Sequence, residues 1–208
     1  MILIGQYDSP FVRRVGIALH LYGIAYEHRP WSTFGDADRI APFNPLRRVP
    51  TLVLDDGEVV IESGAILDHL DQAVGATQAL MADRGARRRR ELKLCALGSG
   101  LADKAVALIY ERVLHEQTSA VWTERCRTQI AGVLDALEAD RPGTPYWFGD
   151  TIGHPDIMVA CALRFLMDAH PGLFAPAAWP ALAAHAARCE ALPVFQTVAQ
   201  AFEAPADR

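Results

Sequence analysis

The sequence predicts a chain in two parts: an α/β domain with a small mixed sheet, followed by an all-helical domain. The first third of the chain alternates strand and helix signals, whereas the rest places apolar residues at helical spacing in one segment after another. Between them, Gly75 to Gly85 is short, polar and turn-prone. We therefore expect a first domain over residues 1–75, a linker over 76–84 and a helical domain over 85–208.

In the first domain, the expected order is strand, helix, strand, hairpin and helix. A helix over Pro10–Tyr22 follows from its apolar spacing, with Ser9 as the N-cap and Gly23 at the end. An Asp-Gly turn between two β-branched runs predicts the hairpin, and Ser63 is expected to cap the next helix. The predicted strands are Met1–Gln6, Ala25–Pro30, Thr51–Leu54 and Val59–Ile61, with a short helix near Ala37–Ala41.

In the second domain, His154–Ala169 is apolar on nearly every side, which predicts a buried central helix in a bundle. The run Arg87 to Arg90 is interpreted as a solvated face at the start of a long helix, with an anionic docking patch as the alternative. The other predicted helices are Arg87–His115, Thr118–Asp140, Ala181–Ala191 and Val194–Ala201.

Composition excludes several classes of protein. A net charge of −5 argues against a general nucleic-acid binder. No apolar run approaches the ~20 residues of a membrane span, and the N-terminus lacks signal-peptide features, so we expect a cytoplasmic protein without a membrane partner. No CxxC pair or zinc spacing exists, so we expect no metal, and reduced, buried cysteines at Cys95, Cys126, Cys161 and Cys189.

Three local motifs carry chemistry. The first, Tyr7 to Val15, places the Ser9 hydroxyl at a strand-to-helix turn, where free backbone N–H groups and the helix dipole favour an anion such as a thiolate. Taken alone, Ser9 is most simply an ordinary helix cap.

The second motif, Asn44 to Leu52, puts Pro50 at the start of a strand. Trans is the default for the Val49–Pro50 bond on sequence alone, whereas cis would turn the Val49 backbone toward an extended ligand. In the third motif, Ser63 and the first N–H groups of a helix can hold a carboxylate, and Glu62 can hold an ammonium. Taken alone, the pair is most simply an ordinary helix cap, Ser63, next to an exposed acid, Glu62.

In this order and spacing, the three motifs together resemble the glutathione transferase family, and the resemblance covers nearly the whole chain. It includes the Ser-Pro-Phe opening, the Asn-Pro-x-x-x-Val-Pro segment, the Glu-Ser pair and the helical second half. The resemblance implies a bacterial, serine-type member with a thioredoxin-like first domain built on a mixed four-stranded sheet.

By position, the resemblance makes Ser9 the residue that contacts the glutathione sulfur. Tyr7 is the alternative hydroxyl for that contact, and Phe11 is expected at the mouth of the site. Cysteine-type members carry a cysteine where this chain has Ser9, so the resemblance argues against thiol transfer through a mixed disulfide.

The same resemblance assigns the rest of the glutathione site. The Val49 main chain is expected to pair with the cysteinyl part of glutathione, with Pro50 in the family's cis position. Glu62 and Ser63 match the anchors of the γ-glutamyl part, and Arg48 is a candidate contact for the glycyl carboxylate.

The segment Gly149 to Ile157 resembles the motif that opens the family's buried helix in the second domain, and it makes Asp156 a structural residue. The family usually has Ser or Thr three residues earlier, forming a capping box, whereas this chain has Gly153. We expect Asp156 to accept the Gly153 N–H without the reciprocal side-chain bond.

The expected activity is conjugation of the glutathione thiolate to a small hydrophobic electrophile, in detoxification, by a homodimer. Candidates for the second-substrate pocket are Leu101, Ala105, Leu108, Ile109 and Tyr110, although ordinary bundle packing is the simpler expectation for most of them. A glutathione-dependent peroxidase, a dehalogenase and a non-catalytic glutathione-binding scaffold of the same fold remain alternatives. An isomerase fits less well, because that class resembles a Ser-Ser-Cys opening that this chain lacks.

Overall fold

A four-stranded mixed sheet organises the first part of the chain in the computed structural model, which describes residues 1–204. The strand order is β2-β1-β3-β4, with β1 parallel to β2 and antiparallel to β3, and with β3 antiparallel to β4. The predicted mixed sheet and hairpin are therefore confirmed. The strands are β1 (Ile2–Ile4), β2 (Glu27–Arg29), β3 (Thr51–Val53) and β4 (Val59–Ile61).

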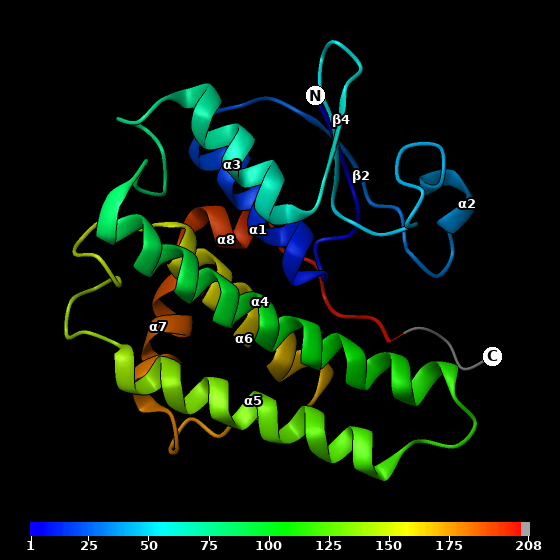
Figure 1. The fold of residues 1–208 in the computed structure, drawn as a ribbon. Helices are drawn as coiled ribbons and strands as arrows, with labels where there is room; N and C mark the ends of the chain where they lie inside the picture. The colour runs from blue at the N-terminus through cyan, green and yellow to red at the C-terminus, as the bar shows by residue number, and fades with distance from the viewer. Residues whose placement is uncertain (205–208) are drawn as a thin grey trace.

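Three helices cover this sheet: α1 (Pro10–Leu21), α2 (Ala37–Ile40) and α3 (Ser63–Val74). Figure 1 shows α1 and α3 side by side on one face and the short α2 on the other. The packing agrees, because buried residues of α1 and α3 form one apolar cluster with Leu3 and Leu52, whereas Ile40 of α2 packs with Ile4 and Val53. Helices thus pack on both faces of the sheet.

The second part of the chain is entirely helical: α4 (Gly85–Leu114), α5 (Ala120–Asp140), α6 (His154–Ala169), α7 (Pro180–Glu190) and α8 (Pro193–Thr197). The long helices α4 and α5 run side by side, and α6 packs against α4, α7 and α1. Nearly every residue of α6 is buried, which confirms the predicted central helix.

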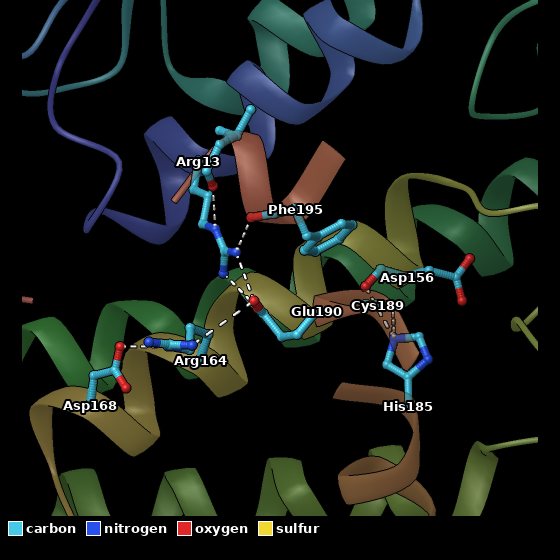
Figure 2. Close-up of polar contacts among 9 residues, drawn as sticks. Arg13, Asp156, Arg164, Asp168, His185, Cys189, Glu190 and Phe195 are labelled. Carbon is cyan, nitrogen blue, oxygen red and sulfur yellow. Dashed lines mark hydrogen bonds and ion pairs between the residues drawn. The ribbon is translucent and has the colours of Figure 1, made fainter. Parts of the chain in front are cut away.

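Arg13 of α1 ties the two parts of the chain together (Figure 2). Its two terminal nitrogens donate to the Glu190 carboxylate at 2.6 and 2.8 Å, and its Nε donates to the Val198 carbonyl at 2.8 Å. Burial alone would lower the pKa of Arg13, but the Glu190 carboxylate outweighs it and raises the pKa. The Arg13 guanidinium therefore anchors α1 to α7 and to the end of α8.

Several predicted elements are shorter than expected, including the second strand, which covers Glu27–Arg29 and not Ala25–Pro30. The first strand ends at Ile4 because Gly5 turns the chain with φ +129°, and a Cβ there would lie 2.8 Å from the Val49 Cβ. The last helix ends at Thr197 because Val198 leaves the helical conformation, and its carbonyl accepts from Arg13 instead. The predicted cap at Ser63 is wrong: α3 begins at Ser63, Glu62 takes the cap position, and no side chain caps the helix.

The Asp156 carboxylate holds the start of α6, as expected. It accepts the N–H of Gly153 at 3.0 Å and the N–H of Trp147 at 3.0 Å. The structure also gives a reason for glycine in place of the family's Ser or Thr, because a Cβ at residue 153 would lie 2.9 Å from the Leu80 carbonyl oxygen.

The remaining expectations concern charge, cysteines and membranes. Three arginines of the basic run form ion pairs, with Glu91, Asp68 and Asp140. All four cysteines are free, and Cys95 is less buried than the others. No helix within residues 1–204 is both long and apolar enough to cross a bilayer. In the same part of the chain, no three His, Cys, Asp or Glu side chains are grouped so that they could hold a metal ion.

Candidate active site at the start of α1

Ser9 is the N-cap of α1, as predicted. Its Oγ accepts the Val12 N–H over 3.4 Å, and its carbonyl accepts the Arg13 N–H over 2.9 Å. Within residues 1–204, the N–H of Phe11 has no hydrogen-bond partner, and Pro10 has no N–H to satisfy. The Ser9 hydroxyl hydrogen and the Phe11 N–H are therefore available to donate to an anion.

A cavity of about 290 Å³ lies beside Ser9. Ser9, Phe11, Arg48 and Val49 all line it, so the structure brings these four predicted residues together. Most of its remaining wall is aromatic or aliphatic, and a few carboxylates are among the lining groups. The other lining residues are Gln6, Asp8, Pro10, Trp31, Ser32, Thr33, Phe34, Asp103, Val106, Ile109, Tyr110, Phe165, Phe202 and Glu203.

The Val49 backbone lies open at this cavity. The Val49–Pro50 bond is cis, so the trans default taken from sequence alone is wrong and the family's cis position is matched. Within the described part of the chain, neither the N–H nor the carbonyl of Val49 has a hydrogen-bond partner. These two groups can pair with an extended peptide.

Glu62 and Ser63 sit at the start of α3 and do not line the cavity itself. An ion pair of 3.6 Å between Arg48 and Glu62 connects them to its edge. Glu62 has a positive φ of 67°, an uncommon backbone conformation for a residue other than glycine. Ser63 is buried, and its Oγ accepts a hydrogen bond of 2.6 Å from Arg14.

Tyr7, the residue with the alternative hydroxyl, contacts Tyr26 and His28 and does not line the cavity. Its OH lies 2.6 Å from the Tyr26 OH, and its ring stacks on His28. Burial and the Tyr26 hydroxyl raise the pKa of Tyr7 well above its usual range. Tyr7 is not among the residues that line the cavity beside Ser9.

The expected second-substrate residues of α4 divide into two groups. Ile109 and Tyr110 line the cavity. Leu101, Ala105 and Leu108 pack instead into the apolar core of the helical part, so their assignment to the pocket is wrong. Bundle packing, the simpler expectation, accounts for those three.

Sequence reasoning missed much of the cavity wall. Trp31 and Phe34 come from the segment between β2 and α2, and Phe202 comes from the chain after α8. The available signal was the presence of large aromatic residues in a loop, where no predicted strand or helix would bury them. Such residues could have indicated a cavity wall. The carboxyls of Asp8 and Asp103 were also missed, and burial raises the pKa of each.

Comparison with known proteins fits this geometry. The model of the glutathione S-transferase N-terminal domain matches residues 3–78, and that of the C-terminal domain matches residues 120–188. The chain belongs to the glutathione S-transferase family. Its first domain is the thioredoxin-like domain of that family and its second is the helical domain, so the protein is a glutathione S-transferase.

Similar proteins include bacterial members of the family. The uncharacterized GST-like protein YibF of Escherichia coli (strain K12) is 32% identical over 168 residues, which span 80% of this chain and 82% of YibF. A glutathione S-transferase from Methylobacterium radiotolerans JCM 2831, in complex with glutathione sulfonate, is 28% identical with a TM-score of 0.92, covering 100% of this chain and 98% of that one. A family member from Pseudomonas fluorescens Pf-5 with bound glutathione is 32% identical with a TM-score of 0.84, covering 95% and 97%.

Proposed function

We propose that this enzyme binds glutathione along Val49 and transfers its thiolate to a small hydrophobic electrophile held in the cavity beside Ser9. The observation that carries this proposal is the Ser9 hydroxyl at the open N-terminus of α1, on the wall of an apolar cavity of about 290 Å³. The related proteins crystallised with glutathione and with glutathione sulfonate support the choice of ligand.

Ser9 is the proposed catalytic residue. Glutathione supplies the sulfur nucleophile, which is weak while protonated because a cysteine thiol has a pKa of ~8.5. Lowering that pKa by ~2 requires about 2.7 kcal/mol of preference for the thiolate. The Ser9 hydroxyl and the Phe11 N–H can supply much of it, since a hydrogen bond to a charged group contributes about 1.5–3 kcal/mol.

Other residues would hold the tripeptide in place. The N–H and carbonyl of Val49, both free of partners within residues 1–204, would pair with its cysteinyl residue, next to the cis Pro50. Glu62 and Ser63 would hold the γ-glutamyl end, and Arg48 would meet the glycyl carboxylate. Phe11 would border the reacting sulfur.

The electrophile would occupy the part of the cavity between the first domain, residues 1–75, and the helical domain, residues 85–208. Phe34 from one side and Tyr110 from the other meet there with ring centroids 5.4 Å apart. The family resemblance further supports a cytoplasmic homodimer that acts in detoxification.

Ultraviolet absorbance of the bound thiolate tests the role of Ser9. In a Ser9→Ala variant, the pKa of the bound thiol should rise by about 1–2 pH units, because the lost hydrogen bond favoured the thiolate. Tyr7→Phe removes the alternative hydroxyl and should leave that titration unchanged. An unchanged titration in Ser9→Ala, or a rise in Tyr7→Phe alone, would remove Ser9 from this role. Glutathione binding without turnover of a chlorodinitrobenzene electrophile would favour a non-catalytic scaffold.

A further inference from the structure

The cavity beside Ser9 carries more negative than positive charge. Among residues 1–204, the side chains of Asp8, Asp103 and Glu203 line it, whereas Arg48 is the only lysine or arginine that does so. None of the ion pairs found in this part of the chain includes any of the three carboxylates. Charges of one sign that line a cavity with apolar walls attract an ion of the opposite sign, here a cation.

Arg48 does not balance these three charges. Its guanidinium forms the 3.6 Å ion pair with Glu62, and in the proposed function it also meets the glycyl carboxylate of glutathione. Lys104, next to Asp103 in the chain, lies 5.3 Å from the centroid of the Trp122 ring and does not line the cavity. The bound thiolate would add a further negative charge at the start of α1. The second substrate is therefore the component that can bring a balancing positive charge.

Asp8 is the carboxylate best placed to meet that charge. It directly precedes Ser9 in the chain and lines the same cavity, and it is partly buried, whereas Asp103 and Glu203 are exposed. Burial raises the pKa of Asp8, the Glu203 carboxylate raises it further, and the Ser9 backbone N–H opposes both effects. Water screens a partly buried charge less than an exposed one, so a cation would gain most beside Asp8.

The aromatic rings of the cavity give a second, independent reason for a cation. Phe34 and Tyr110 meet edge to face with ring centroids 5.4 Å apart, and Phe165 and Phe202 do so at the same distance. No lysine or arginine of residues 1–204 lies over any of these four rings. The Trp31 ring differs, because an arginine already lies 4.3 Å from its centroid. The faces of aromatic rings attract cations, and quaternary ammonium groups are recognised in this way.

We propose that the second substrate is an aromatic electrophile with a positive charge, which Asp8 and the free aromatic rings of the cavity hold, and that Asp8 determines this specificity. The inference rests on the proposed function and names the class of its electrophile. With an aryl chloride, the thiolate sulfur bonds to the ring carbon that carries the chlorine, and chloride leaves with the bonding electron pair. Nothing is oxidised or reduced, and the positive charge stays on the product. Anionic electrophiles are disfavoured, because like charges repel in the same cavity.

Three chloronitrobenzamides that differ in the charge of one substituent test this proposal. Their amide nitrogen carries a trimethylammonioethyl group, an uncharged neohexyl group of the same shape, or a carboxyethyl group. For each compound, kcat/KM at saturating glutathione is divided by the rate constant of the uncatalysed reaction, which removes differences in intrinsic reactivity. The wild type should prefer the cation to the neohexyl compound about 10-fold, and it should prefer the neohexyl compound to the anion.

Asp8→Asn keeps the shape of the side chain and removes its charge. The preference for the cation over the neohexyl compound should fall to about 2- to 3-fold in this variant, which leaves the contribution of the aromatic rings. Asp150→Asn is the matched control, because it removes an exposed carboxylate that does not line the cavity, and it should keep the wild-type preference. The comparison of the three compounds needs only the wild type, so it tests the inference even if Asp8→Asn does not fold.

Several results would count against the inference. Equal normalised kcat/KM values for the cation and the neohexyl compound, or a preference for the anion, overturn it while turnover itself still supports the proposed function. An unchanged preference in Asp8→Asn overturns the role of Asp8. Absence of turnover of all three compounds by the glutathione-loaded protein overturns the proposed function and the inference with it, so the two failures are distinguishable.

Discussion

His185 of α7 is a titratable residue enclosed by the helical part of the protein (Figure 2). Its Nε2 lies 3.1 Å from the Asp156 carbonyl oxygen, and its Nδ1 has no partner within residues 1–204. Because a carbonyl only accepts, Nε2 carries the hydrogen in the neutral ring. Burial lowers the pKa of His185 to about 4, even though the hydrogen bond to Asp156 opposes the shift.

This pKa predicts an acid-sensitive stability. The unfolded chain binds a proton at His185 near pH 6.5, whereas the folded protein does so only near pH 4. Between these values the unfolded state holds more protons, so the contribution of His185 is fully present above pH 6.5 and is lost as the pH falls toward 4. The difference amounts to about 3 kcal/mol. Urea unfolding of the wild type and of His185→Gln at pH 7 and pH 4 measures it.

The Gln variant should lose about 3 kcal/mol less than the wild type on acidification, because an amide in that place stays neutral. His20→Gln, which removes an exposed imidazole, serves as the control variant in the same measurements. Equal losses in the wild type and His185→Gln would show that His185 does not control the acid response.

At the scale of elements, the start of α6 depends on the absence of a side chain at Gly153. The Leu80 carbonyl accepts the His154 N–H at 3.1 Å, which draws the segment after α3 against the first turn of α6. A Cβ on Gly153 would lie 2.9 Å from that carbonyl oxygen. Because the oxygen belongs to the backbone, no side-chain rotation can relieve the clash.

Gly153→Ser therefore tests which effect dominates at this turn. A serine would complete the capping box with Asp156. Compared with glycine, this should raise the free energy of unfolding by only about a few tenths of a kcal/mol. Steric overpacking costs about 1–3 kcal/mol, so we expect the variant to lower the free energy of unfolding. Gly132→Ala in the exposed interior of α5 has open space and should stabilise by about 0.5–1 kcal/mol. Chemical denaturation of both variants measures the change in the free energy of unfolding. A Gly153→Ser variant more stable than the wild type would contradict the steric argument.

Local sequence patterns predicted the helices and strands well, but they did not predict which of these elements contact one another. The caps and apolar spacing around Ser9 and Pro10 were sufficient to place α1, because helix starts depend on neighbouring residues. Ser63 was misplaced by one position because its Oγ is occupied by Arg14, forty-nine residues earlier in the chain. Likewise Leu101 and Ile109 share one helix, and only the packing of α6 and of the first domain decides which of them reaches the cavity.

On the scale of the whole molecule, the cavity beside Ser9 lies where the first part of the chain meets the helical part, and both supply its wall. Phe34 comes from the connection between β2 and α2, Tyr110 from the long helix α4, and Phe165 from the central helix α6. Phe202, after α8, closes on Phe165 with ring centroids 5.4 Å apart. The glutathione groups proposed above, in contrast, all come from residues 1–75.

This division predicts that the two substrates can be perturbed separately. Tyr110→Ala removes the ring that meets Phe34 across the cavity, so the KM for a chlorodinitrobenzene electrophile should rise about 10-fold, as for losing one aromatic contact. The KM for glutathione should stay within twofold, roughly, because Tyr110 lies on the helical side of the cavity. Tyr110→Phe keeps the ring and should behave as the wild type in steady-state kinetics. If Tyr110→Ala raised both KM values equally, the electrophile would not occupy the space between Phe34 and Tyr110, and its binding would have to be sought among residues 1–75.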